Sequence, residues 1–82
     1  MNLYATLVSI DGDEVTYRIG YYCNNITGIV VYNYKAGTYK VISEPIDADR
    51  PLYRNALTSL FAKYQSSFVK GIFPEKISRE IG

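Results

Sequence analysis

The first half of the chain alternates apolar and polar residues with a period of two, which is typical of β-strands. The pattern covers four segments, namely residues 2–10, 14–23, 26–34 and 38–44. Asp11-Gly12, Asn24-Asn25 and Lys35-Ala36-Gly37 separate them with residues that favour turns, and Pro45 ends the last one because it lacks an amide hydrogen. Three short turns in succession predict a four-stranded antiparallel meander.

Pairing register decides which side chains share a face of this sheet, because successive residues of a strand point to opposite sides. A two-residue turn at Asn24-Asn25 pairs Ile19 with Val30 and places Tyr21 opposite Gly28, and a Tyr34–Tyr39 pair would set the fourth strand. The predicted inner face comprises Val15, Tyr17, Ile19, Tyr21, Cys23, Val30, Tyr32, Tyr34, Tyr39 and Val41.

The first strand leaves two alternatives. A three-residue loop with a bulge at Gly12 would add Leu3, Ala5 and Leu7 to the inner face. A two-residue loop would instead add Tyr4, Thr6 and Val8. We prefer the first alternative.

A helical period replaces the alternation after the linker at residues 45–50. Apolar residues recur at positions 53, 57, 60, 64 and 68, with 56 and 61 alongside, and form one stripe. Asp49 is a candidate N-cap, Pro51 suits the first helical position, and Gly71 is a natural stop. The sequence therefore predicts a helix over residues 51–70.

The tail, residues 71–82, predicts one or two helical turns, because Pro74 suits a helix start and Ile77 and Ile81 are four residues apart. The fold class is then α+β: a single two-layer domain, in which residues 1–44 form a four-stranded antiparallel β-meander packed by one long C-terminal α-helix. The expected core joins Tyr17, Ile19, Val30, Tyr32 and Val41 to Leu57, Leu60, Phe61, Tyr64 and Phe68.

Size and charge narrow the function classes. A chain of 82 residues with one cysteine has no internal disulfide, so its stability must come from core packing, helped by self-association. The net charge of +1 disfavours nucleic acid and anionic membranes as partners. The N-terminus does not resemble a signal peptide and no apolar run is long enough to span a bilayer, so we expect a cytoplasmic protein.

Residues for common catalytic chemistry are scarce. The chain has no histidine to activate Cys23, which we expect to be a small buried residue at the end of a strand. Asp11, Asp13 and Glu14 do not follow the spacing of a calcium loop. We therefore expect no enzyme activity, no catalytic residue, no metal and no cofactor.

The outer face of the predicted sheet is unusually apolar for a surface in contact with water. Its candidate interface residues are Tyr4, Val8, Arg18, Tyr22, Ile29, Val31 and Ile42, with Ile10 beside them. Three interpretations compete: the sheet curls or residues 72–81 fold back over this face, two copies associate through it, or another protein docks there. For docking, Tyr4, Arg18 and Tyr22 are the candidate anchors.

The sequence thus favours a small non-catalytic protein-interaction module, an inhibitor or regulator that binds a protein partner or itself through this face. A homodimer or a stable complex is preferred to a lone monomer. The alternative is a nucleic-acid-binding regulator in which Tyr4 and Tyr22 stack on bases beside Arg18 and Lys40. No signature of a nucleic-acid-binding family supports that alternative.

Overall fold

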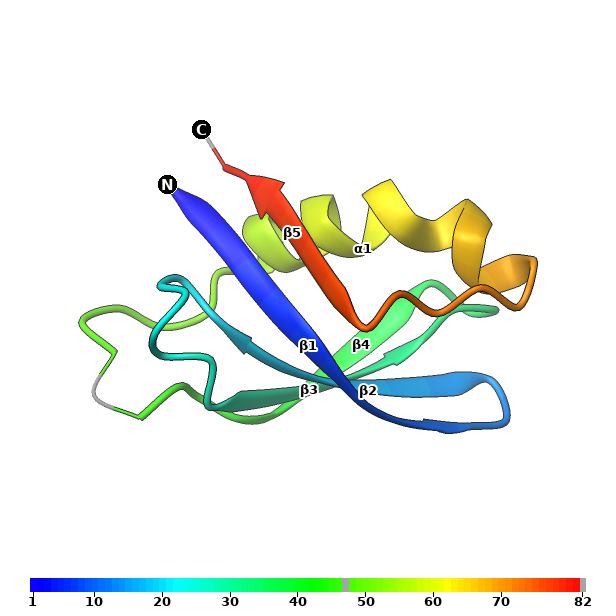
Figure 1. Ribbon diagram of the computed structural model, residues 1–82, viewed down its shortest axis with the longest axis horizontal. Coiled ribbons are helices and arrows are strands. Elements are labelled where there is room, and N and C mark those ends of the chain that lie inside the picture. Colours follow the sequence, from blue (N-terminus) through cyan, green and yellow to red (C-terminus); the bar gives the residue numbers. More distant parts are fainter. Residues whose placement is uncertain (47, 82) are drawn as a thin grey trace.

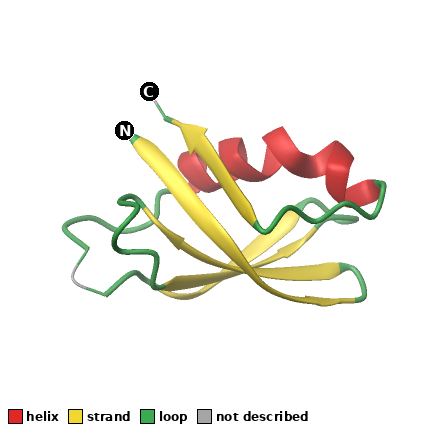
Figure 2. Ribbon diagram, viewed as in Figure 1, coloured by secondary structure: helices red, strands yellow, loops and turns green. Residues whose placement is uncertain are grey.

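The computed structural model describes residues 1–46 and 48–81, so Asp47, in the predicted linker, and Gly82, in the tail, lie outside the described residues. The elements are β1 (Asn2–Asp11), β2 (Glu14–Gly20), β3 (Gly28–Asn33), β4 (Thr38–Ser43), α1 (Arg54–Val69) and β5 (Lys76–Glu80). The strands form an antiparallel sheet in the order β4-β3-β2-β1-β5, and α1 lies across one of its faces (Figures 1 and 2). This confirms the α+β class and the meander, and adds a fifth strand.

The fifth strand replaces the helical turns that we predicted for the tail. In β5, Ile77 pairs with Ala5 and Ser78 pairs with Tyr4, both in β1. Ile77 is only 3% exposed, because it enters the core under α1. Residues separated by an even number share one face of a strand, so the spacing of Ile77 and Ile81 fits a strand as well as a helix. The pattern did not distinguish the two.

The strand pairs of β2 with β3 and of β3 with β4 differ from the predicted ones by two residues, although β2 and β3 keep their predicted faces. Tyr17 lies opposite Val30, and Tyr32 lies opposite Tyr39. The first change arises because the tight turn is centred one residue earlier than Asn24-Asn25, where the amide of Asn25 donates to the carbonyl of Tyr22 at 2.9 Å. Moving the turn by one residue shifts each pair by two and leaves the faces unchanged.

The second change has its cause in the side chain of Asn33. Its amide oxygen accepts hydrogen bonds from the backbone amides of Lys35 and Ala36, at 3.1 and 3.0 Å, which builds the turn from residue 34 to residue 37. Tyr34 therefore lies in the turn and does not pair with Tyr39. Gly28, for its part, lies opposite Ile19 rather than Tyr21.

β1 confirms the preferred inner face but not the predicted bulge. Leu3 and Ala5 are buried, and the turn has two residues because Asp11 pairs directly with Glu14. The bulge lies at Val8 instead of Gly12, since Leu7 faces Tyr17 and Ser9 faces Thr16. One consequence is that Ile10 pairs with Val15 on the helix side of the sheet, so its predicted place on the outer face was wrong.

The two ends of α1 differ in how well the sequence predicted them. The predicted N-cap at Asp49 and the predicted start at Pro51 were wrong: α1 begins after Tyr53, which makes no capping hydrogen bond through its side chain. The approach to the helix is fixed by the hydroxyl of Tyr21, which accepts a hydrogen bond from the amide of Tyr53 at 2.9 Å. At the other end Gly71 takes a φ of 82° and closes the helix, as predicted.

The core between α1 and the sheet matches the predicted one. Tyr17, Phe61 and Phe68 are its largest fully buried side chains, and the Tyr32 ring stacks on Phe61 with centroids 4.3 Å apart. Val41 and Tyr64, which we placed in the core, pack against it and are partly buried. The structure also adds residues that the predicted core lacked, among them Leu3, Leu52, Ala56 and Ile77.

Candidate interaction face

The sheet face that α1 does not cover, called the open face below, is the candidate interaction surface. Its residues alternate with the buried ones along each strand: Tyr4, Thr6, Thr16, Arg18, Ile29, Val31, Lys40, Lys76 and Ser78. Four of the seven candidate residues therefore lie on it, namely Tyr4, Arg18, Ile29 and Val31.

Arg18 stands at the centre of the open face. It lies between Thr6 of β1 and Ile29 of β3 in the strand pairing. Val31, two residues along β3, lies between Thr16 and Lys40. The structure thus brings branched apolar side chains, threonines and cations into adjacent rows around an arginine, a residue that is enriched at protein interfaces.

The charge of this face is positive. Arg18, Lys40 and Lys76 belong to it, and the ion pairs among the described residues, Lys35–Asp13 and Arg50–Asp49, involve none of the three. Its acidic residues lie toward the strand ends, as Glu14 does at the β1–β2 turn. The centre of the face is therefore both apolar and cationic.

Val8 and Ile42 occupy bulges. Each is the extra residue where the strand pairing shifts, Val8 in β1 and Ile42 in the edge strand β4. Their side chains are 49% and 54% exposed. A bulge turns a side chain away from the regular alternation, so Ile42 has no partner residue in β3.

Tyr22 lies outside the strands and serves the linker. Its hydroxyl donates a hydrogen bond to the Asp49 carboxylate, with 3.0 Å between the oxygens. This bond lowers the pKa of Asp49, as does the neighbouring Arg50. Asp49 therefore holds the linker against the β2–β3 loop, a tertiary role that its predicted function as a helix cap did not suggest.

A small pocket opens on the open face beside Tyr4. It has a volume of about 310 Å³ and is lined by Tyr4, Ala5, Thr6, Cys23, Ile26, Lys76, Ile77 and Ser78. The β2–β3 loop forms one wall because it crosses Gly20 so closely that a Cβ atom there would lie 1.9 Å from the carbonyl oxygen of Asn25. Cys23 is exposed at this wall, so our prediction of a buried cysteine was wrong. The chain leaves the strand at Gly20, before the alternation reaches Cys23.

The tail does not cover the open face. Phe73 stacks on Phe68, with ring centroids 5.7 Å apart, and Ile77 is buried, so both pack on the helix side of the sheet. Val8 and Ile42 are also exposed. The interpretation in which residues 72–81 fold back over this face is therefore wrong for the described residues.

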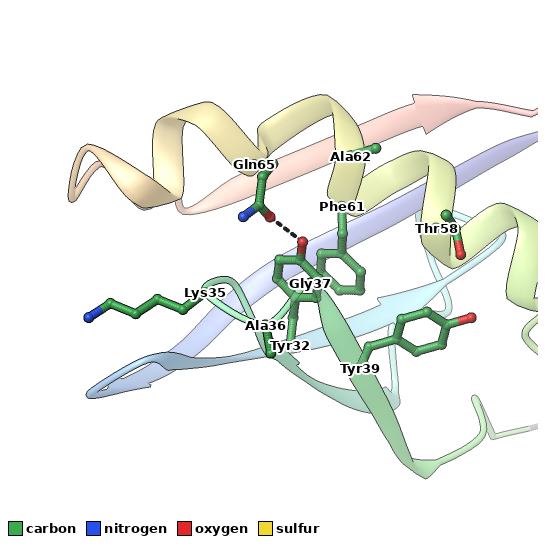
Figure 3. Close-up of a pocket in the computed structure, with 9 residues that line it drawn as sticks. All are labelled: Tyr32, Lys35, Ala36, Gly37, Tyr39, Thr58, Phe61, Ala62 and Gln65. Carbon is green, nitrogen blue, oxygen red and sulfur yellow. Dashed lines mark hydrogen bonds between the residues drawn. The ribbon is translucent and has the colours of Figure 1, made fainter.

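A larger cavity lies on the opposite side of the sheet, between β4 and α1. Its volume is about 480 Å³, and its lining residues are Tyr32, Lys35, Ala36, Gly37, Tyr39, Thr58, Phe61, Ala62 and Gln65. Figure 3 shows the rings of Tyr32, Tyr39 and Phe61 gathered between the strand and the helix. Sequence reasoning missed this cavity, because alternation assigns residues to faces and does not show where the helix leaves a face uncovered.

Comparisons with known proteins give no relative, since no family model, no curated protein and no solved structure matches the chain. Among residues 1–46 and 48–81, no group of three or more His, Cys, Asp or Glu side chains is placed to hold a metal ion. Within the same residues, no helix has the length and apolarity that crossing a membrane requires. The function must therefore be argued from the surfaces of the protein.

Proposed function

We propose that the protein is a small non-catalytic interaction module that binds the acidic, partly apolar surface of a protein partner through its open face, as an inhibitor or regulator would. The observation that carries this proposal is the set of unpaired cations among apolar residues: Arg18, Lys40 and Lys76 beside Ile29 and Val31. An arginine at the centre of a patch is a common energetic anchor of an interface.

The positive charge of the open face favours an acidic partner. Carboxylates opposite the three cations would form hydrogen-bonded ion pairs, which speed association and fix the orientation of the partner. The apolar side chains of Ile29, Val31 and the exposed Ile42 would supply buried area in the same contact. Tyr22 contributes less than the sequence suggested, because its hydroxyl is engaged by Asp49.

A capture experiment tests this proposal. The protein, immobilised and exposed to nuclease-treated extract of the cells that make it, is compared with its Arg18→Glu variant and with Lys70→Glu as a control of equal charge change. Lys70 is exposed at the C-terminal end of α1, away from the open face. We expect a protein that is retained by the wild type and by Lys70→Glu and is lost with Arg18→Glu.

Two results would contradict the proposal. Equal retention by all three proteins would show that the open face is not the binding surface. Retention from an untreated extract that disappears when the extract is nuclease-treated, with an affinity that falls steeply as salt rises, would instead support the nucleic-acid alternative. Circular dichroism checks that the variants fold. Arg18 is exposed, so its replacement should leave the core intact.

A further inference from the structure

The two edge strands of the sheet differ in how accessible their outward peptide groups are, and side chains of α1 block the edge at β5. The hydroxyl of Tyr64 accepts a hydrogen bond from the amide of Ser78 at 3.3 Å and lies 3.2 Å from its carbonyl oxygen. The ammonium group of Lys63 donates to the same carbonyl at 3.0 Å. Side chains of α1 therefore occupy the amide and carbonyl of Ser78 in the middle of β5, and the charged residues of β5 oppose pairing as well.

The edge at β4 is open. β4 is the last strand on its side of the sheet, and its neighbour is β3. Within the described part of the chain, the one hydrogen bond that β4 makes outside its ladder comes from a side chain, the Tyr39 hydroxyl, which donates to the carbonyl of Arg54 at 3.2 Å. The outward peptide groups of β4 are thus available, and β4 carries a single charged residue, Lys40.

A groove lies on the helix side of the sheet, beside the start of this open edge. Its larger part is the cavity of about 480 Å³ described above, where Tyr39, Phe61 and Ala62 are among the lining residues (Figure 3). An adjoining hollow of about 310 Å³ is lined by Gly37, Thr38 and Tyr39 and by the helix residues Arg54 and Thr58. The groove therefore lies beside the first residues of β4 and the turn before them, with aromatic rings in its lining and a basic residue, Lys35 or Arg54, in each of its two parts.

We propose that β4 binds an extended segment of a partner protein, in which apolar and acidic residues alternate, as a sixth strand of the sheet. Main-chain hydrogen bonds to an open edge give affinity in such pairing, and alternate side chains give specificity. Every second side chain of the segment would enter the groove over Tyr39 and Phe61. The intervening side chains would lie on the open-face side next to Lys40, where a carboxylate is favoured.

A second copy of the chain fits this edge less well than an acidic segment does. The sequence of β4 contains no carboxylate, and antiparallel pairing of two β4 strands would bring a second Lys40 to the same side of the sheet. Like charges near each other across strands destabilise the pair. The charge therefore selects an acidic segment as the occupant.

The groove beside β4 and the open face lie on opposite sides of the sheet, although the two proposals share Lys40. Ala62, Thr58 and Phe61 lie on α1, on the other side of the sheet from Arg18. Ala62→Glu therefore tests binding at β4 and Arg18→Glu tests the open face, and neither variant changes Lys40.

The probe is a short capped peptide that alternates glutamate with valine and phenylalanine, titrated into isotope-labelled protein and followed by nuclear magnetic resonance. We expect amide shifts in Thr38–Ser43 and at Thr58 and Ala62, and slower hydrogen exchange for the outward amides of β4. The same peptide with lysine in place of glutamate should bind at least about tenfold more weakly, because like charges then face Lys40.

A matched pair of variants locates the site. Ala62→Glu places a carboxylate in the groove wall and should weaken binding of the acidic peptide by about tenfold. Ser66→Glu makes the same charge change one helical turn further along, at an exposed residue that does not line the groove, and should leave binding unchanged. Both positions are exposed, so neither change disturbs the core.

Three results would overturn the proposal. The first is that the acidic and basic peptides bind alike or fail to bind. The second is that the shifts map to the open face and do not respond to Ala62→Glu. The third is that the β4 amides become protected as the protein concentration rises without any peptide, which would assign the edge to a second copy of the chain.

Discussion

Tyr17 connects β2 with α1 and with the segment before β5. Its side chain is fully buried between Phe61 and Phe68, and its hydroxyl donates a hydrogen bond to the carbonyl of Pro74 at 2.8 Å. The bond ties β2 to the segment that leads into β5. Burial, and to a smaller extent the nearby Tyr64, raises the pKa of Tyr17 to about 12.

This pKa predicts a loss of stability at alkaline pH. Between pH 10 and 12 the unfolded chain loses the phenolic proton of Tyr17 while the folded protein retains it, so the free energy of unfolding falls as pH rises through this window. Below pH 10 the contribution is complete. Tyr17→Phe should cost about 1 kcal/mol at neutral pH through the lost hydrogen bond, and make the alkaline decline less steep.

Urea unfolding at a series of pH values measures both effects. A residual decline is expected in the variant, because burial also raises the pKa values of Tyr21 and Tyr32. Parallel stability curves for wild type and Tyr17→Phe across the alkaline range would show that Tyr17 does not titrate differently in the folded state.

Predictions from the sequence failed most often for single residues whose positions depend on tertiary contacts. The alternation of residues 14–23 continues through Cys23, yet Gly20 lets the chain leave the strand because no Cβ blocks the carbonyl of Asn25. Asp49 has the character of a helix cap, but the hydroxyl of Tyr22, distant in sequence, binds it instead. Local patterns carry no information on such tertiary partners.

At the scale of elements, the predictions that proved correct were those in which the sequence pattern extends over many residues. The helix stripe extends over several turns and was found with its core face correct, whereas the five residues of β5 are too few to separate a period of two from a helical one. What decides in favour of a strand is tertiary: β1 offers an edge, and Ile77 fills space beneath α1.

The element-scale prediction concerns β5. Ile77→Ala should lower the free energy of unfolding by about 2–5 kcal/mol, which is the range for truncating a buried aliphatic residue. Leu60→Ala, in the centre of α1, should lower the free energy of unfolding by a similar amount. Similar costs for the two variants would show that β5 belongs to the core as α1 does. Ile72→Ala is the control, because Ile72 is 58% exposed and its loss should change stability by less than about 0.5 kcal/mol.

Denaturant melts of the three variants give the comparison. A cost for Ile77→Ala as small as that of Ile72→Ala would show that β5 is not docked in solution and that the tail is an independent appendage.

For the whole molecule, the faces of the sheet were predictable and the pairs were not. Both register changes moved a strand by an even number of residues, so Ile29 and Val31 stayed on the open face while their partners changed. Odd changes occurred at the bulges in β1 and β4, and Ile10 moved to the other face beyond the first of them. The sequence therefore placed four of the seven candidate residues on the open face, whereas the charge pattern of this face and the groove at β4 required the tertiary structure.

That charge pattern bears on the oligomeric state. The apolar outer face led us to favour a homodimer from the sequence, and a stable interface would need to bury about 1,200 Å² or more. Packing two open faces together would also bring Arg18, Lys40 and Lys76 of one copy toward the same cations of the other, without a carboxylate at the centre of either face. Burying cations without carboxylate partners is strongly destabilising, which opposes a homodimer through this face.

We therefore expect the isolated protein to remain a monomer in light scattering across a dilution series at low ionic strength. Val31→Lys should leave the molar mass that of a monomer and lower the free energy of unfolding by about 1 kcal/mol or less, because Val31 is half-buried on the open face and the new ammonium group lies opposite Lys40. A dimer that Val31→Lys dissociates would place a self-interface on the open face and contradict this expectation. If the dimer also strengthens as salt is added, screening of the facing cations would be the cause, and the partner of this surface would be a second copy of the chain.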